Sequence, residues 1–257
     1  MTTRDHRFTV EGTPSLSIRM PSGDVRIVEG DPGEVAVHLD GRDSALARII
    51  VEQRGDEIVV EPDGPSRGWR SSVDLTVRVG VPPRLSGRLV ASDLNVTVPL
   101  RELTVDSASG DISALDVGGD VTIRTASGDV RLGDVTGALE VTTASGDVRV
   151  GSVEGTVLAR TASGDVRVGA ATGDVTGKSA SGDVSIVRFT GNALDVKSLS
   201  GEVTIGVTAG RTFEIDFQTL SGEVRTDFPV SDSTPSGPSA RLSAKTISGD
   251  IEIRAAT

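Results

Sequence analysis

Apolar and polar residues alternate along most of this chain, and glycines divide the alternation into short segments. The pattern is clearest in the middle of the chain, where an 18-residue unit holds two segments of nine residues. In the unit that begins at Gly128, the first segment has Val130 and Leu132 at alternating positions, and the second has Leu139 and Val141. A period of two is typical of strands with one buried face. The pattern therefore predicts two short strands per unit, and no segment shows the period of a helix.

A short motif, Ser-Gly-Asp/Glu-Val/Ile, marks one end of each unit. The four steps from Ser109 to Ser181 are 18 residues each, and the later steps lengthen to 19, 21 and 27. A fixed period of this length predicts stacked structural repeats. Glycine supplies the positive φ that a tight corner needs. The motif begins at nine serines: Ser22, Ser109, Ser127, Ser145, Ser163, Ser181, Ser200, Ser221 and Ser248.

Equivalent strands of successive units are expected to pair in parallel, about 4.8 Å apart. The predicted fold class is all-β: a parallel β-solenoid (β-helix) with 18-residue coils and two strands per coil, right-handed by the general preference of parallel crossover connections. Residues 101–257 form this solenoid, with a loop insertion at about 228–239. Residues 1–100 alternate without the period, which predicts an irregular β or sandwich-like N-terminal cap. Such a cap protects a sheet edge that otherwise invites aggregation.

The same pattern suggests which corner side chains face the core. We expect two core-facing rows, of which the second grows larger along the chain and marks a core that widens toward the C-terminus. Phe213 and Phe217 fill the wider coils or border a ligand pocket between them. The first row is Val117, Val135, Val153, Ala171 and Phe189, and the second is Ala108, Ala126, Ala144, Ala162, Ala180, Leu199, Leu220 and Ile247. An outward row of hydroxyls, suited to a regular surface or simply part of the strands, is predicted at Thr125, Thr143, Thr161, Ser179 and Ser198.

Composition and charge narrow the partners. The net charge is −11, arginine outnumbers lysine 23 to 3, and no basic cluster stands out along the sequence. We therefore expect no nucleic-acid partner and no binding to anionic membranes. The chain has no cysteine, which excludes disulfides and thiol chemistry. With no signal peptide visible and no long apolar run, we expect no membrane insertion and a cytoplasmic location.

The chain resembles a known group. The alternating N-terminal strands, the Gly80-Val81-Pro82-Pro83 turn and the run Ala126-Ser127-Gly128-Asp129-Val130-Arg131-Leu132 look like the bacterial putative-adhesin family of β-strand-repeat proteins. That family is a domain of unknown function with an adhesin-head-like β-solenoid. The resemblance implies a β-solenoid with a non-enzymatic role, and it offers no active site to transfer. No signal peptide is visible, which counts against exposure on the cell surface. Surface exposure would require a non-standard export route.

The turn carboxylates are the main candidate for chemistry. Arg131, Arg149 and Arg167 lie two residues after their aspartates, on the same strand face. One interpretation is that these carboxylates cap the turns and pair with the arginines. A second is that they bind divalent cations, although calcium takes six to eight oxygens and the Gly-Gly-x-Gly-x-Asp pattern of calcium-binding repeats is missing. A catalytic carboxylate pair at glycosidase spacing is the third interpretation. The acidic row is Asp111, Asp129, Asp147, Asp165, Asp183, Glu202, Glu223 and Asp250.

Other catalytic or metal-binding patterns are missing from the sequence. His6 and His38 have no neighbours at metal-ligand spacing, and Trp69, the only tryptophan, lies outside the repeat. Neither a nucleophile elbow nor a phosphate-binding glycine loop occurs. We therefore predict no catalytic, cofactor-binding or metal-binding residues, and no cofactor.

Three functions are compatible with these observations. The first is a non-catalytic binding module, a rigid solenoid that displays repeated Asp, Arg and Thr faces to an unknown protein or envelope partner. The second is a self-assembling scaffold of the bactofilin kind, in which the final coil at Ile251 and Ile253 offers an uncapped edge. The third is a carbohydrate-active β-helix enzyme. Regular outward chemistry without a catalytic break favours the first.

Overall fold

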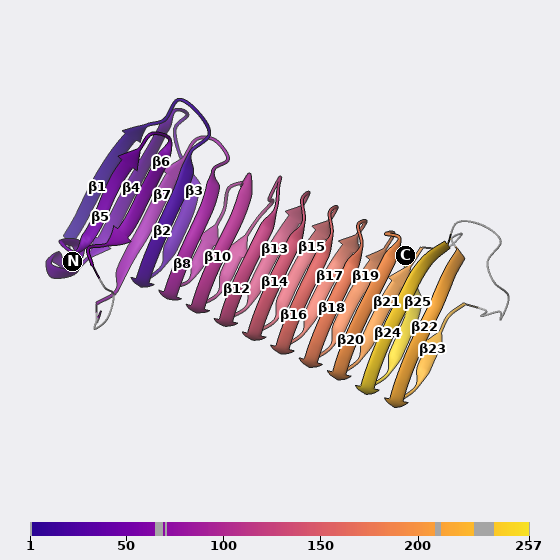
Figure 1. Cartoon of the computed structure of the whole chain (residues 1–257). Coiled ribbons are helices and arrows are strands. Elements are labelled where there is room, and N and C mark those ends of the chain that lie inside the picture. Colours follow the sequence, from indigo (N-terminus) through magenta and orange to yellow (C-terminus); the bar gives the residue numbers. More distant parts are fainter. Residues whose placement is uncertain (1, 65–68, 70, 209–211, 229–238, 257) are drawn as a thin grey trace. The chain divides into compact units, whose positions relative to one another are not determined.

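The computed structural model describes residues 2–64, 69, 71–208, 212–228 and 239–256, and it divides into two compact units, Met1–Leu132 and Gly133–Thr257 (Figure 1). Strands dominate both units, and the described residues contain one helix, α1 (Asp43–Leu46). Each regular coil contributes one strand to each of two sheets. The all-β prediction is therefore confirmed.

In the first unit, parallel coils begin earlier than the regular 18-residue period. One sheet has the order β5-β6-β2-β8-β10-β12, and the other has the order β1-β4-β7-β3-β9-β11-β13. From β2 and β3 onward, successive coils pair in parallel. The motif at Ser22 therefore joins the two strands of a coil within residues 1–100, and the predicted domain division at 101 stays a prediction. The coil strands are β2 (Ser15–Ser22), β3 (Val25–Glu29), β8 (Arg84–Ala91), β9 (Leu94–Val96), β10 (Glu102–Ser109), β11 (Ile112–Ala114), β12 (Val121–Ser127) and β13 (Val130–Val135).

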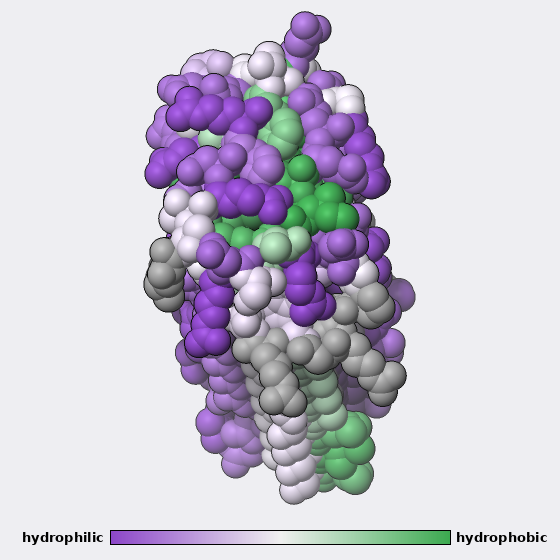
Figure 2. Space-filling view, turned by 90° about the vertical axis from the view of Figure 1, so that its left-hand side faces the viewer, coloured by the Kyte–Doolittle hydropathy of each residue, from purple (hydrophilic) through white to green (hydrophobic). Residues whose placement is uncertain are grey.

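The start of the first unit is closed by antiparallel strands. β1 (Thr2–Thr9), β4 (Glu34–Gly41) and β7 (Val73–Val79) pair in succession, and β5 (Ile49–Arg54) pairs with β6 (Glu57–Pro62). The guanidinium of Arg4 in β1 donates hydrogen bonds to the carbonyls of Leu46 (2.9 Å) and Ile49 (2.8 Å), which joins the edge strands of the two sheets. Figure 2, viewed from the side on which β1 and β5 lie in Figure 1, shows hydrophilic side chains over most of this end, around one apolar area.

The second unit is the regular part of the solenoid. Its sheets have the orders β14-β16-β18-β20-β24-β22 and β15-β17-β19-β21-β25-β23, and the neighbouring strands are parallel. The predicted parallel β-solenoid is confirmed. Its strands are β14 (Leu139–Ser145), β15 (Val148–Val153), β16 (Val157–Ser163), β17 (Val166–Ala171), β18 (Val175–Ser181), β19 (Val184–Phe189), β20 (Ala193–Ser200), β21 (Val203–Val207), β22 (Thr212–Ser221), β23 (Val224–Thr226), β24 (Ser239–Ser248) and β25 (Ile251–Ala255).

The last coils do not stack in chain order. Strands β24 and β25 lie between the β20/β21 coil and the β22/β23 coil, so the outermost coil is the penultimate one in sequence. The prediction of an uncapped edge at Ile251 and Ile253 is wrong, because β25 is paired on both sides and both residues are buried. The predicted loop insertion falls mostly on residues 229–238, which lie outside the described residues.

The inward side chains of the outermost strand are only partly covered. Ile215 is 39% exposed, and Phe213 and Phe217 are half-buried, because β22 has a neighbour on one side only within the described residues. These aromatic residues therefore do not fill wider coils, as the sequence suggested. They form the inner face of a terminal coil.

The two predicted corner rows behave differently. The first row, from Val117 to Phe189, is confirmed as buried. The second row points outward, and the hydroxyl row predicted to be outward is buried, since Thr125, Thr143 and Thr161 are 7%, 4% and 7% exposed. The reason is that the alternation continues unbroken to the end of the strand. Val121 and Ile123 face inward, so the next inward position is the threonine and not the alanine. The core does not widen: Leu199, Ile247 and Leu220 lie outside it, 55%, 52% and 85% exposed.

The five hydroxyls of this row donate hydrogen bonds to carbonyl oxygens at the adjacent turns, whereas the equivalent Thr246 Oγ1 has no partner among the described residues. Thr161 Oγ1 donates to the carbonyl oxygen of Ser163 at 3.0 Å, and Thr143 donates to Ser145 at the same distance. The carbonyl of Ser163 also accepts from the amide of Gly146. We expect Thr161→Val to lower the free energy of unfolding by about 1 kcal/mol, the net value of one hydrogen bond whose acceptor keeps a second donor. Urea denaturation followed by circular dichroism measures it, with Thr176→Val on the outer face as a control expected to stay within about 0.5 kcal/mol. Equal effects would contradict a role for the hydroxyl.

Candidate binding surface

The turn carboxylates hold successive coils together. Asp147 Oδ1 accepts a hydrogen bond from the backbone amide of Asp165 (3.0 Å), and Asp165 Oδ1 accepts one from the amide of Asp183 (2.9 Å). The second oxygen of Asp147 pairs with Arg149 at 2.8 Å. The acidic row therefore caps turns, and Arg131 and Arg149 pair with it as the first interpretation predicted, whereas Arg167 forms no ion pair with a described residue. Among the described residues, no three acidic or histidine side chains are grouped as metal ligands.

The outer face of the second unit carries four cations in adjacent strands, which we call the basic row. Arg160 in β16 is in register with Lys178 in β18, Lys178 with Lys197 in β20, and Lys197 with Lys245 in β24. Neighbouring strands lie about 4.8 Å apart, so the row has one positive charge per coil. The three lysines are the only ones in the chain. No basic cluster stands out along the sequence, and the row forms only through the strand register.

The basic row escaped detection because its members are 18, 19 and 48 residues apart in sequence. A scan for charge runs looks at neighbouring residues, whereas the solenoid brings distant residues into register. A signal was present nevertheless. Each of the four cations stands three residues before a motif serine, so aligning the repeats on that serine places them in one column.

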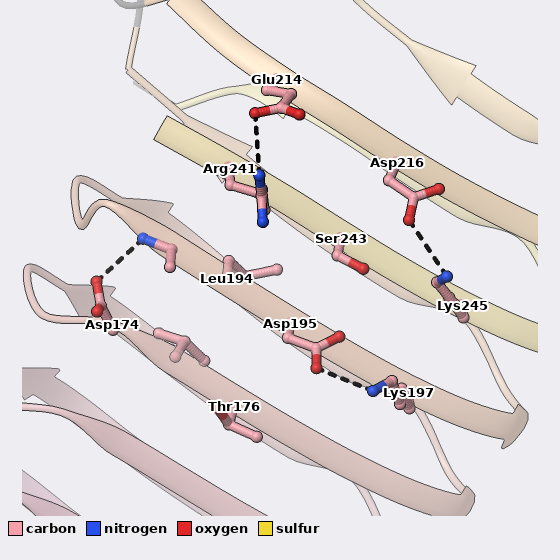
Figure 3. A pocket seen from close by; sticks show the side chains of 12 residues that line it. Asp174, Thr176, Leu194, Asp195, Lys197, Glu214, Asp216, Arg241, Ser243 and Lys245 are labelled. Atoms are coloured by element: carbon pink, nitrogen blue, oxygen red, sulfur yellow. Dashed lines mark hydrogen bonds and ion pairs between the residues drawn. The ribbon is translucent and has the colours of Figure 1, made fainter. Parts of the chain in front are cut away.

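The two halves of the basic row differ in their partners. Lys197 Nζ lies 3.0 Å from Asp195 Oδ2, and Lys245 Nζ lies 3.2 Å from Asp216 Oδ2 (Figure 3). The hydrogen bond from Lys245, followed by that from Gln218, lowers the pKa of Asp216 below its ordinary value. The side chains of Arg160 and Lys178, by contrast, form no hydrogen bond or ion pair with any described residue.

A shallow groove of about 630 Å³ runs across β18, β20, β24 and β22 on this face. Figure 3 shows Lys197 and Lys245 on one side of it and the Glu214–Arg241 pair, whose charged atoms are 3.5 Å apart, near the far end. Thr176 and Ser243 add hydroxyl groups between the charges. The groove is lined by paired charges and hydroxyls, and so it presents hydrogen-bonding groups without an isolated acid or base.

A second row of side chains crosses the same strands. Leu199 in β20, Ile247 in β24 and Leu220 in β22 occupy equivalent outward positions, and we call them the aliphatic row. The equivalent positions of the preceding coils are alanines: Ala144, Ala162 and Ala180. The outward alanine therefore gives way to a large aliphatic residue from β20 onward, the strand of the second lysine. This change is the break in the repeat that marks a candidate site.

The architecture is that of a two-sheet parallel β-solenoid whose outer face, rather than a pocket in its core, carries the unusual side chains. The chain matches the family described as Toastrack DUF4097 over residues 14–254, and it belongs to that family. The predicted family resemblance is thereby confirmed. No curated protein matches the chain.

Solved structures with similar folds carry related descriptions. A putative adhesin from Parabacteroides distasonis is 11% identical, with 98% of this chain and 97% of that chain covered and a TM-score of 0.45. A putative adhesin from Parabacteroides merdae is 10% identical, with 98% and 96% covered and a TM-score of 0.46. A putative lipid binding protein from Parabacteroides distasonis is 13% identical, with 98% and 96% covered and a TM-score of 0.44. In the part of the chain that the structure describes, no helix has the length and apolar character needed to cross a membrane.

Proposed function

We propose that this chain is a non-catalytic binding module of the putative-adhesin type, and that its basic row holds an anionic partner. The observation that carries the proposal is the alignment of all three lysines with Arg160 on adjacent strands of an acidic chain. The groove beside the row supports a binding role, because Asp195, Glu214 and Asp216 each pair with a cation and Asp174 accepts hydrogen bonds from backbone amides, so none is set apart as a catalytic acid or base.

Repulsion within the basic row explains why an anion is favoured there. Like charges opposite each other on neighbouring strands are destabilising, by roughly 1 kcal/mol per pair in water at this spacing. Asp195 and Asp216 relieve the repulsion at Lys197 and Lys245. No described residue relieves it at Arg160 and Lys178, so an anionic group bound there gains the attraction of two cations. Because the chain carries a net charge of −11, other surfaces repel the same partner, which directs it to this row.

Carboxylate polymers provide a direct test of this proposal. We expect immobilised poly-glutamate or polygalacturonate to bind the protein, and the double variant Arg160→Ser/Lys178→Ser to bind about tenfold more weakly or worse, because each charged contact is worth about 1.5–3 kcal/mol. Biolayer interferometry at two salt concentrations measures the binding, which should weaken as salt screens the charges.

The matched control is Arg149→Ser/Arg167→Ser, which removes two arginines that are equally in register on the other sheet. We expect this control to bind the polymers like the unaltered protein. If neither polymer binds, or if both double variants bind equally well, the basic row is not an anion site and the proposal fails.

Self-assembly is the second candidate function, favoured by one observation. The outermost strand β22 leaves Ile215 and its inward neighbours partly exposed at a sheet edge that no other described strand pairs with. Glu214 and Asp216 on the outer face of the same strand place like charges where two copies would pair, which disfavours it. Sedimentation velocity separates the two candidates, since concentration-dependent growth into large species would favour a scaffold.

A further inference from the structure

We infer that the partner of the basic row is an acidic amphipathic helix of another protein, lying across strands β16, β18, β20, β24 and β22. The inference rests on the proposed function and names its partner. It uses a second set of side chains that an anion alone leaves unexplained, namely the aliphatic row of Leu199, Ile247 and Leu220.

The basic row and the aliphatic row run side by side in β20 and β24. Leu199 follows Lys197 by two residues in β20, and Ile247 follows Lys245 by two residues in β24. Residues two apart in a strand lie on the same face, about 7 Å from each other. A purely hydrophilic polyanion contacts only the cations and leaves three large aliphatic side chains in water. Contiguous exposed apolar side chains rimmed by polar ones are typical of protein interaction surfaces.

The spacing of the coils matches a helix. One turn of an α-helix rises 5.4 Å, and neighbouring strands are about 4.8 Å apart, so a helix laid across the strands presents about one turn to each coil. Across three strand-to-strand steps the mismatch adds up to only about 2 Å. Apolar residues at the i, i+3/i+4 and i+7 positions of one stripe can therefore contact Leu199, Ile247 and Leu220 in turn.

A partner in strand form fits this surface less well. Side chains on one face of a strand recur about every 7 Å, so they fall out of step with the coils. Strand addition also requires a free sheet edge. Strands β18, β20 and β24 are each paired on both sides, and a strand added at the outer edge of β22 would be separated from Lys197 and Lys245 by β22 itself. The contact must therefore be made through side chains, which is how a helix docks.

The charges on the two sides of the aliphatic row determine which flank of the partner helix is acidic. On one side of the aliphatic row lie Lys178, Lys197 and Lys245, which favour glutamates on the facing flank. On the other side, past the corner, lie the motif carboxylates Glu202 and Asp250, which repel them. The partner helix therefore has an apolar stripe with one acidic flank, and its other flank is neutral or basic.

Designed peptides test this inference without knowledge of the natural partner. The probe is a fluorescent peptide of about 18 residues, about five turns, with a leucine stripe and glutamates on one flank only. The comparators are a scrambled peptide of the same composition, poly-glutamate, and vesicles of phosphatidylserine and phosphatidylcholine. The variants are Leu199→Ser/Ile247→Ser and Arg160→Ser/Lys178→Ser, with Val187→Ser, an exposed valine on the other sheet, as the control.

We expect the amphipathic peptide to bind and to gain helicity, and its affinity to fall about tenfold or more in either double variant but not in the control. Poly-glutamate should respond only to the loss of Arg160 and Lys178. If the scrambled peptide binds equally well while poly-glutamate still depends on the basic row, the helix is overturned and the anion-binding function stands. If neither peptide nor polyanion binds, both are overturned. If only the vesicles bind, and lose binding in both double variants, the aliphatic row meets a lipid surface and the helix is overturned.

Discussion

Replacing Gly164 by alanine is expected to lower the free energy of unfolding of the second unit by about 3–5 kcal/mol. Gly164 has a φ of +123°, a backbone conformation that residues other than glycine rarely adopt. A Cβ atom there would lie 2.3 Å from the carbonyl oxygen of Gly146, the equivalent glycine of the preceding coil. Backbone strain and backbone overlap therefore add, and the neighbouring atom belongs to a turn that cannot move alone. Urea denaturation followed by circular dichroism measures the loss.

The control for this prediction is another glycine of the same unit. Gly177 lies within strand β18 with ordinary backbone angles, and a Cβ there would lie 3.4 Å from a methyl group of Val196, an ordinary contact. We expect Gly177→Ala to raise stability by about 0.5–1 kcal/mol, since glycine within a strand is less favourable than alanine. If both substitutions have the same effect, the motif glycines are not required by the close stacking of the turns.

The architecture could be predicted because short sequence patterns determine it and because these patterns repeat along the chain. Alternating apolar residues fix the strands, the glycine at each corner fixes the turn, and the constant step of 18 residues leaves parallel stacking as the arrangement that aligns both. The same reasoning predicts that the corner residue Phe189 lies in the core, because it continues a row of three valines and one alanine, and the structure buries it.

Prediction and structure differ where the size of a side chain and its place in the alternation disagree. Leu199, Leu220 and Ile247 are large and apolar, which suggested a wider core, but their position in the period places them outside. The stacking order of the C-terminal coils could not be predicted from the sequence either. Strands β22 and β24 both end in the motif and both alternate, so either fits against β20, and the preference for chain neighbours to pair is only a tendency.

The candidate site could not be predicted from any single segment. Lys178, Lys197 and Lys245 are isolated in the sequence and become neighbours only through the strand register. Their partners depend on side-chain geometry as well. Asp195 is two residues from Lys197 in the same strand. Asp216, in contrast, pairs with Lys245 from β22, which precedes β24 in sequence but lies at the end of the sheet, beyond β24. Such contacts follow from the stacking order, which the sequence does not specify.

Replacing Phe189 by alanine is expected to lower the free energy of unfolding of the second unit by about 3–5 kcal/mol. Its side chain is fully buried, and its neighbour in the preceding coil is the small Ala171, which leaves no larger side chain on that side to occupy the space. The ring also packs tightly on its own turn, since a Cβ atom at Gly191 would lie 2.7 Å from Phe189 Cε2. Because the backbone is hydrogen-bonded to strands on both sides, it cannot collapse into the cavity. The lost stability therefore includes the cost of the cavity as well as the transfer free energy of the buried ring.

The exposed Val187, two residues earlier in the same strand, separates this cause from a general effect on β19. Val187→Ala should change the free energy of unfolding by no more than about 0.5 kcal/mol, measured by urea denaturation as for Phe189→Ala. Adding Ala171→Leu to Phe189→Ala should restore part of the loss, because a larger side chain in the adjoining coil then occupies the vacated volume. A double variant as unstable as Phe189→Ala alone would mean that the two corner positions do not share one space, and that the coils pack independently at this corner.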